Sequence, residues 1–464
     1  MSDRLQIFRA AWVVTQAGPP IADGEVVVED GRIAEVRPAT RGTGDVRDLG
    51  ESVILPGLIN AHTHLDYTVM RGILEDIEFF PWIRELTMRK MALDPSDWAA
   101  SAEWGAAEAV AGGITTIADC TDSGAALGGA LSLGLSGVVY QEVFGIDDRL
   151  PVEPIVLELE EKVTALRRAA EGTRVRVGIS PHAPYTVRPA LFTALGEFAR
   201  GAKLPVCIHA AESRAEAQLL RSGHGPIAEM LAGRGIGFAP PGNSTVAYFS
   251  QLGMLGPRTL LVHGVQLSAA DLESARASGT SWVHCPKSNA KLGNGVAPLG
   301  LMGRGRQPES IRPRLGLGSD SVASNNTMDM FEEMRFAVLM QRGARRRIDA
   351  LTAPEALEMS TLGGARALGI DRETGSLEPG KYADLCVVGL DTLHSRPCYD
   401  PVSALVYAAS ARDVVLTMAG GAVLYDAGRG GVAASRFTQV DIRRTGERLE
   451  NAIQKMRDWR APTV

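Results

Sequence analysis

The middle of the chain, from about Pro56 to Ala367, alternates short apolar runs with longer segments rich in Ala, Leu, Glu and Arg. The apolar runs are VILPGLINAHTHL, GITTIADC, LSGVVYQEVFG, VRVGIS, LPVCIHAAE, TLLVHG, TSWVHCPKSN and RLGLGSDS. Eight strands that alternate with helices predict an α/β fold, a (β/α)8 barrel of the TIM type. An open doubly wound sheet is the alternative, but no GxGxxG opens a helix after an early strand, so dinucleotide binding lacks support.

Polar residues capable of chemistry stand at the carboxyl ends of six of these eight runs. They are His62 and His64, His182, His209 with Glu212, His263, His284, and Asp320. A barrel builds its active site at this end of its strands. Histidines that merely pack in a core would not select one end of successive strands, so the pattern favours the barrel and places a candidate site on it.

The two ends of the chain have a different, β-rich texture. LQIFRAAWVVT and GEVVVEDGRIAEVRP come first, and the Asp30-Gly31 pair between alternating apolar residues predicts a hairpin. Similar β-rich segments return late in the chain, in GSLEPGKYADLCVVGL and VVLTMAGGAVLYDAG. We therefore expect a small β-sandwich domain built from both termini. The predicted limits are 1–55 with 368–435 for this domain, 56–367 for the barrel, and 436–464 for a C-terminal segment whose amphipathic part, 437–459, is helical.

The composition excludes several classes of function. A net charge of −6 gives no basic surface for nucleic acid or an acidic membrane. No apolar stretch reaches the ~18 residues that span a bilayer, and the first residues do not resemble a signal peptide. The 5 cysteines are far apart and form no CxxC, so we expect buried thiols rather than disulfides or a cysteine metal site. These features predict a cytoplasmic protein with a small-molecule substrate, and they are compatible with a homo-oligomer.

The His62-Thr63-His64 sequence places two imidazoles on one face of a strand, because side chains alternate with period two. Two neutral imidazoles can share a divalent cation such as zinc. His209 and Asp320 complete three nitrogens and one oxygen, a ligand set that leaves a position for water, as catalytic sites do. Each has a structural alternative: His209 as a hydrogen-bonded core histidine and Asp320 as a helix cap.

Glu212 follows His209 by three residues. A metal lowers the pKa of its bound water to ~7, but a neighbouring carboxylate is needed to move the proton to a leaving group. The alternative for Glu212 is a first-turn glutamate that the helix dipole favours. We expect His263 to hydrogen-bond the attacking water or to polarise the substrate, and His182 to contact the substrate. For His284, both of these roles and simple packing stay open.

At HTH, HAAE, LVHG, HCPKSN and GSDS the sequence resembles the amidohydrolase superfamily, specifically its nucleobase and nucleoside deaminase branch. KSNAKLGNGVAPL and SDSVASNNTMDMFEEMR are similar to the S-adenosylhomocysteine and methylthioadenosine deaminase group. The resemblance implies one divalent metal per subunit, zinc first and iron as the alternative. The ligands that it implies are His62, His64, His209 and Asp320, with Glu212 as proton shuttle, His263 bonding water or substrate, and Asp320 also acting as a base. Binuclear members carry a carboxylated lysine at the fourth strand; Ser180-Pro181-His182 here resembles the mononuclear branch.

The resemblance implies hydrolytic deamination of an aminated purine-type compound. A 6-aminopurine nucleoside is the first expectation, either adenosylhomocysteine-like or aminodeoxyfutalosine. A triazine chlorohydrolase or aminohydrolase is the enzymatic alternative. A catalytically silent scaffold is the non-enzymatic one, and the presence of all the expected metal ligands argues against it. The His-x-Glu and Pro-Cys-x-x-Cys pattern of cytidine deaminases is absent.

One segment departs from the adenosylhomocysteine group. That group holds the ribose hydroxyls with an acidic residue shortly after an LRG-like segment, whereas residues 86–91 read LTMRKM here and Glu85 is the nearest acid. Phe79, Phe80 and Trp82 precede this stretch. They form either an aromatic wall over a purine, with Trp82 as a substrate contact, or ordinary packing between a helix and the barrel.

Overall fold

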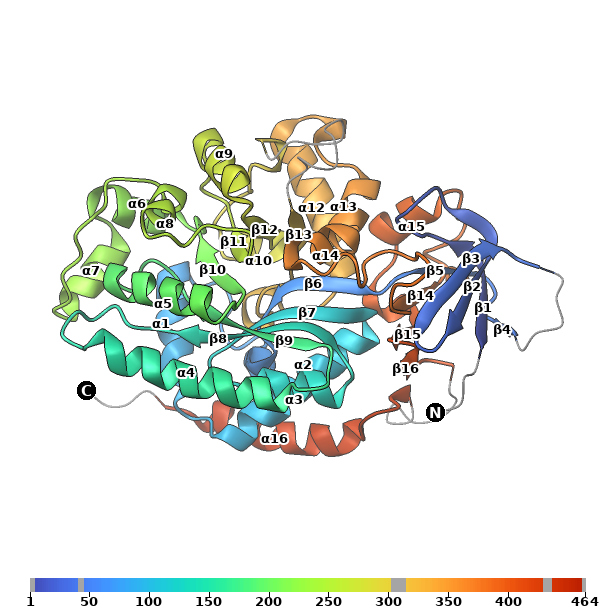
Figure 1. The fold of residues 1–464 in the computed structure, drawn as a ribbon, viewed down its shortest axis with the longest axis horizontal. Helices are drawn as coiled ribbons and strands as arrows, with labels where there is room; N and C mark the ends of the chain where they lie inside the picture. Colours follow the sequence, from blue (N-terminus) through green and yellow to red (C-terminus); the bar gives the residue numbers. More distant parts are fainter. Residues whose placement is uncertain (1–4, 41–45, 302–313, 429–435, 461–464) are drawn as a thin grey trace.

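The computed structural model describes residues 5–40, 46–301, 314–428 and 436–460 (Figure 1). Its strands are β1 (Gln6–Val13), β2 (Ile21–Glu29), β3 (Arg32–Pro38), β4 (Val46–Asp48), β5 (Ser52–Pro56), β6 (Leu58–Thr63), β7 (Ile114–Thr121), β8 (Ser136–Val143), β9 (Val175–Pro181), β10 (Val206–Ala210), β11 (Thr259–His263), β12 (Ser281–His284), β13 (Leu315–Leu317), β14 (Leu385–Gly389), β15 (Val414–Ala419) and β16 (Ala422–Asp426).

The helices before the seventh barrel strand are η1 (Leu65–Met70), α1 (Phe79–Lys90), α2 (Pro95–Ala111), α3 (Ala125–Ser132), α4 (Val152–Ala169), α5 (Pro189–Gly201), α6 (Arg214–Ser222), α7 (Pro226–Gly233), α8 (Thr245–Gln251) and α9 (Ala269–Ser278). Those that follow are α10 (Pro286–Lys291), η2 (Leu299–Leu301), α11 (Val322–Asn325), α12 (Met330–Arg345), η4 (Ile348–Ala350), α13 (Ala353–Met359), α14 (Leu362–Leu368), α15 (Pro401–Tyr407), η5 (Ala411–Asp413) and α16 (Ile442–Asp458).

Strands β6 to β13 form the predicted barrel, and each pairs in parallel with its neighbour in chain order. Six of them, all but β9 and β13, are buried along their whole length. Helices cover the outside of a parallel sheet, which is why these strands read as continuous apolar runs rather than alternating ones. The expected (β/α)8 architecture is confirmed.

The ring closes where β13 returns to β6. Thr63 and Asp320 form a parallel bridge, and the Asp320 N–H donates to the His62 carbonyl at 2.9 Å. Gly318 makes this approach possible: a Cβ on it would lie 2.8 Å from His62 Cβ, N and O. Such a contact is shorter than side chains tolerate, so glycine permits the closure that brings Asp320 beside His62.

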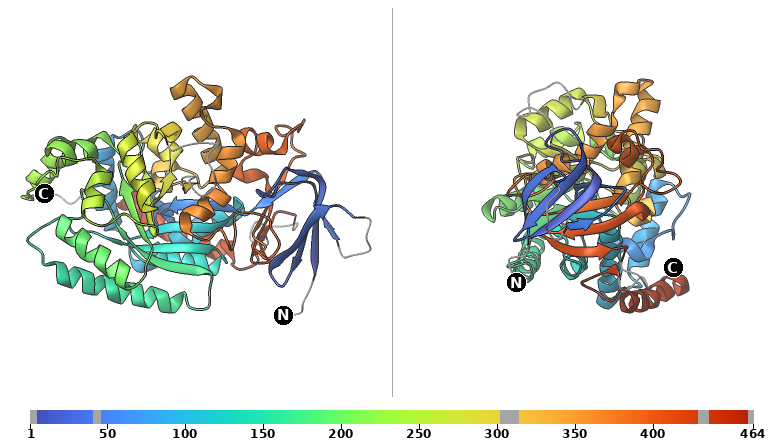
Figure 2. Two further views of the ribbon diagram at one scale, coloured as in Figure 1. Left: turned by 45° about the horizontal axis from the view of Figure 1, so that its top comes forward. Right: turned by 90° about the vertical axis from the view of Figure 1, so that its right-hand side faces the viewer.

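Strands from both termini form a separate eight-stranded mixed sheet, seen at the right of Figure 1. Its order is β16-β15-β14-β5-β1-β2-β3, with β4 on β1, so the early and late strands meet at the antiparallel β5–β14 pair. The predicted hairpin lies between β2 and β3, where Asp30 and Gly31 have φ of 49° and 76°. Two successive positive φ angles characterise the tight turns that match strand twist. Arg174 ties the barrel to this sheet through Asp384, at 2.6 Å. Figure 2 shows the blue N-terminal strands and the red C-terminal strands side by side.

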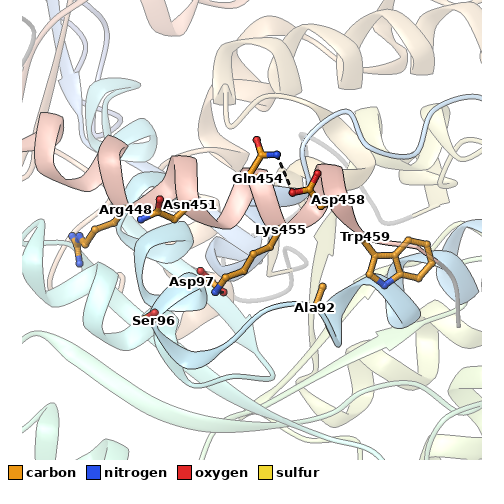
Figure 3. Close-up of a pocket in the computed structure, with 9 residues that line it drawn as sticks. All are labelled: Ala92, Ser96, Asp97, Arg448, Asn451, Gln454, Lys455, Asp458 and Trp459. Atoms are coloured by element: carbon orange, nitrogen blue, oxygen red, sulfur yellow. Dashed lines mark hydrogen bonds and ion pairs between the residues drawn. The ribbon is translucent and has the colours of Figure 1, made fainter.

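The C-terminal helix begins later than predicted. The pattern indicated a helix from residue 437, but α16 begins at Ile442 because the Asp441 side chain accepts from the Arg443 N–H and caps it. Lys455 binds Asp97 at 2.6 Å and fastens α16 to α2. Figure 3 shows a pocket of about 700 Å³ along this seam. Its charged lining groups have partners: Lys455 pairs with Asp97, Arg448 pairs with Glu103, and Asp458 accepts from Gln454. None of the candidate site residues lines it. No helix within the described ranges is long and apolar enough to cross a membrane.

We predict that Gly318→Ala destabilises the barrel by about 1–3 kcal/mol, the usual effect of forcing extra atoms into a packed interior. The control is Gly128→Ala in α3, where a new Cβ meets nothing within 4 Å. That change should be neutral or stabilising, because alanine is the better helix former. Urea unfolding measures both variants. Equal unfolding midpoints for Gly318→Ala and the wild type would contradict the closure argument.

Candidate active site

Four histidines and one aspartate meet at the carboxyl ends of the barrel strands. The His62 ring centroid lies 4.9 Å from that of His64, 4.9 Å from that of His209 and 5.8 Å from that of His263. Candidate ligand atoms of His62, His64 and His209 lie within 4.8 Å of one another, as do those of His62, His263 and Asp320. Strands far apart in sequence thus bring together the residues that the sequence analysis selected.

The nitrogens of this cluster are free to bind a cation. The Nδ1–H of His209 donates to the His182 carbonyl at 2.9 Å, which leaves Nε2 as a lone pair. His62 Nε2 is buried and has no hydrogen-bond partner in the part of the chain that is described. The Nε2 atoms of His62 and His64 lie 3.4 and 3.5 Å from Asp320 Oδ1. Unpartnered buried nitrogens beside one carboxylate oxygen fit a divalent metal ion.

Burial strongly affects the protonation of the histidines in this cluster. Burial and the neighbouring histidines hold the pKa of His209 well below its ordinary value, and burial lowers the pKa of His64 to about 3. Both rings are therefore neutral, the form that binds metals. His62 differs: burial works against its charge, but the nearby Asp320 carboxylate, 3.4 Å from Nε2, raises its pKa to about 10. A metal ion bound beside Asp320 would displace this proton, because metal-binding histidines must be neutral.

Hydrogen bonds from three serines fix the orientation of the Asp320 carboxylate. Its Oδ2 accepts from Ser288 Oγ at 2.6 Å and Ser324 Oγ at 3.1 Å, and its Oδ1 accepts from the Ser321 N–H at 2.7 Å. Burial opposes its ionisation, but the neighbouring His62, His263 and His64 hold its pKa well below the usual value. Asp320 and His263 have φ of 59° and 76°, which non-glycine residues rarely adopt. Backbone strain of this kind concentrates at functional sites.

Glu212 and His263 face each other beside the cluster. Glu212 Oε2 lies 3.9 Å from His263 Nε2, and its Oε1 accepts from Asn294 Nδ2 at 3.0 Å. The Nδ1–H of His263 donates to Asn289 Oδ1 at 3.0 Å, so its Nε2 points to the site as an acceptor. Burial and the charge of Asp320 raise the pKa of Glu212 to about 8. A carboxyl group poised near neutrality can both take up and deliver a proton.

Three supporting residues were not identified from the sequence. Asn289 and Asn294 orient His263 and Glu212, and both lie in the KSNAKLGN segment that carried the resemblance. Glu216 accepts from the backbone N–H groups of Ala211 and Glu212 at 2.7 and 3.0 Å and so fixes the loop after β10. In the sequence, Glu216 can be recognised only as an acidic residue in the first turn of α6, which does not indicate that it fixes this loop.

The β8 and β9 side of the site holds His182 and one further acid. His182 is half-buried, and its ring lies 4.9 Å from Phe144 and 4.6 Å from His209. Glu142 is the last residue but one of β8, its side chain is buried, and burial raises its pKa to about 8. Glu142 is not among the residues predicted from the sequence, because VVYQEVF reads as an ordinary buried strand.

The remaining predicted residues pack around the barrel. Trp82 is buried in α1 among Tyr67, Leu86 and Trp98, and its indole Nε1 has no hydrogen-bond partner among the described residues. Phe79 is also buried, and Phe80 packs beside Tyr185. His284 is buried at the end of β12, and burial lowers its pKa to about 3. The cysteines are free thiols, and four of them are buried as expected, but Cys398 is partly exposed.

Comparison with known proteins agrees with this arrangement. The model of the amidohydrolase family matches residues 53–424. The 5-methylthioadenosine/S-adenosylhomocysteine deaminase of Syntrophobacter fumaroxidans is 34% identical over 402 residues, 84% of this chain and 85% of that protein. The 5'-deoxyadenosine deaminase of Methanosarcina mazei is 32% identical, over 90% of this chain and 92% of that protein.

A solved structure gives the same result. The zinc-bound adenosine deaminase of Xanthomonas campestris superposes with a TM-score of 0.83 at 26% identity, over 98% of this chain and 99% of that one. The family match spans the barrel and the later strands of the small sheet, and the superposition covers nearly the whole chain. The chain therefore belongs to the amidohydrolase family and is a hydrolase that acts on carbon–nitrogen bonds.

Proposed function

We propose that this protein hydrolytically removes the amine of an aminated purine-type compound, with a 6-aminopurine nucleoside as the first choice. The proposal rests on the Glu212–His263 pair, in which Glu212 Oε2 lies 3.9 Å from His263 Nε2. This pair stands beside the cluster of possible metal ligands, His62, His64, His209 and Asp320. The names of the deaminase relatives support the substrate class.

We assign His62, His64, His209 and Asp320 as the ligands of one divalent metal ion, zinc first because the Xanthomonas structure contains zinc, and iron as the alternative. When bound, the metal makes a water molecule nucleophilic at neutral pH. The Ser288, Ser321 and Ser324 contacts hold Asp320 so that one oxygen faces the ligand nitrogens.

Glu212 then moves the protons. Water adds to the ring carbon that bears the amine, and Glu212 passes the water proton to the adjacent ring nitrogen. It then carries the remaining proton of the added hydroxyl group to the amine. The carbon–oxygen bond becomes a carbonyl as the carbon–nitrogen bond breaks, and ammonia leaves. His263 keeps its Nε2 toward the reacting oxygen because Asn289 holds its Nδ1–H. Asp320 serves as a further base on the attacking water, and His182 contacts the substrate.

Several expectations from the sequence stay predictions. These are the domain limits 1–55 with 368–435, 56–367 and 436–464, a cytoplasmic location, homo-oligomer formation, and a substrate contact by Trp82. The packing of Trp82 among Tyr67 and Trp98 favours a structural role for its ring. A triazine hydrolase remains the alternative activity. The zinc complex of atrazine chlorohydrolase from Arthrobacter aurescens shares the fold, with a TM-score of 0.81 at 22% identity over 97% of this chain and all of that one.

The metal assignment predicts that the purified protein holds about one ion per chain. His209→Ala and Asp320→Asn should lose most of it, because each removes a buried ligand, and zinc should no longer raise their thermal midpoint. Metal at 100 times its Kd stabilises a folded protein by about 2.7 kcal/mol. Elemental analysis and thermal unfolding measure both effects. His224→Ala, at an exposed position, is the control. Full metal content in both ligand variants would refute the assignment.

The proton-transfer role predicts that Glu212→Gln loses roughly 10²-fold or more in kcat, the scale of general acid–base catalysis. The amide keeps the shape of the side chain but cannot accept a proton. Metal content should not change, since Glu212 is assigned as no ligand. Steady-state ammonia release measures kcat, with Glu229→Gln on the exposed side of α7 as the control. Near-normal turnover by Glu212→Gln would eliminate the role.

The substrate class predicts ammonia release from adenosine, 5'-deoxyadenosine or 5-methylthioadenosine by the metal-loaded enzyme. A coupled ammonia assay follows the reaction, and conversion of the adenine chromophore confirms which bond breaks. Atrazine serves as the competing probe, with chloride as its product. If no aminopurine yields ammonia while atrazine yields chloride, the nucleoside proposal is wrong and the alternative activity replaces it.

A further inference from the structure

Glu142 leaves one polar atom unaccounted for at the edge of the site. It is the last residue but one of β8 and is only 6% exposed, and its buried Oε1 has no hydrogen-bond partner among the residues that the structure describes. A carboxyl oxygen of Glu142 lies within 4.8 Å of a ring nitrogen of His182 and of one of His209. A buried polar atom without a partner is costly, so its presence calls for a ligand.

His182 presents a second acceptor at the same place. Thr186 Oγ1 donates to the Ala183 carbonyl at 3.1 Å, so at 2.9 Å it accepts the proton on His182 Nδ1. His182 Nε2 is therefore a lone pair. Glu142 and His182 together form an acceptor pair, and the described part of the chain supplies no donor to Glu142 Oε1.

A second metal ion is a poor occupant for this place. It would need a nitrogen of His209 in addition to Glu142 and His182. The Nδ1–H of His209 is bound to the His182 carbonyl, and Nε2 is the nitrogen available to the cluster with His62 and His64. With both nitrogens of His209 committed, only Glu142 and His182 remain, and their two acceptor atoms suit hydrogen-bond donors.

The surrounding charge favours a neutral donor over a cationic one. Lys90 binds Tyr67 Oη at 2.7 Å and forms an ion pair with Asp122, and its charge also acts on the Glu142 carboxyl. A substrate ammonium group would meet this lysine. A hydroxyl group both donates and accepts, so it satisfies Glu142 and His182 whether or not the carboxyl carries a proton.

We propose that Glu142 and His182 bind the vicinal hydroxyl groups of the substrate's sugar. This inference rests on the proposed function and adds the specificity determinant to it. The arrangement of strands gives the substrate a direction. Glu212 and His263 contact the base from the side of β10 and β11. Glu142 and His182 bind the sugar from the side of β8 and β9. Phe144, 40% exposed and 4.9 Å from the His182 ring, marks the solvent side of this subsite.

The test compares adenosine with 2',3'-dideoxyadenosine on the zinc-loaded full chain. Calorimetry in a Glu212→Gln background, which lacks the proton shuttle, gives Kd for each, and ammonia release by the chain with Glu212 gives kcat and KM. With Glu142 intact, the protein should bind adenosine at least about 10-fold more tightly. Glu142→Ala should reduce that preference to about 2-fold or less, raise KM for adenosine more than it lowers kcat, and leave the dideoxy compound nearly unaffected. The control is Glu158→Ala on α4, an exposed acid in an ion pair with Lys162.

Three outcomes would overturn the subsite: no preference with Glu142 intact, the same preference in Glu142→Ala, or a second zinc ion that disappears in Glu142→Ala. Calorimetry measures binding independently of ammonia release, so failure of the proposed function can be distinguished from failure of the sugar subsite. If the proposed function fails, neither nucleoside yields ammonia, but the preference for hydroxyl groups still decides for or against Glu142. Glu142→Gln, which keeps the volume and one acceptor, should fold like the wild type and retain part of the preference.

Discussion

The contact that closes the barrel is the constraint on which the site depends. The Asp320 N–H donates to the His62 carbonyl at 2.9 Å, so the last strand is joined to the first at the level of the histidines. Gly318 allows this approach because it has no Cβ to meet His62. One backbone hydrogen bond therefore sets the distance between the Asp320 carboxylate and the His62–His64 pair, and the serines around Asp320 then fix its orientation.

Burial explains why this closure leads to chemistry. The strand ends exclude water, so histidine charges are unfavourable and the rings of His64 and His209 are neutral. Carboxyl groups in the same environment bind their protons more tightly, as the raised pKa values of Glu212 and Glu142 show. The neutral rings of His64 and His209, the ionised Asp320 and a proton-carrying glutamate are complementary. They suit a site where a cation supplies the positive charge and a glutamate moves protons.

Much of this arrangement could be predicted from the sequence. Eight apolar runs gave the barrel, and period-two alternation together with the rule for strand ends brought His62, His64, His209, His263 and Asp320 to one place. The ends of the chain were less predictable. The start of α16 at Ile442 depends on a cap by Asp441, which is a local contact that periodicity does not reveal. Glu142 escaped notice because an acid within an apolar run gives no sign of which partners it lacks. Asn289, Asn294 and Glu216 act through loop geometry, which only the folded structure defines.

The most direct measurement is a crystal structure of the zinc-loaded protein with diffraction data collected at the zinc absorption edge. The account predicts one anomalous peak per chain, with nitrogens of His62, His64 and His209 and one Asp320 oxygen at about 2.0–2.2 Å. Glu212 should lie beside the metal without binding it. A peak centred away from these four residues, or one bound by Glu212 in place of Asp320, would contradict the account.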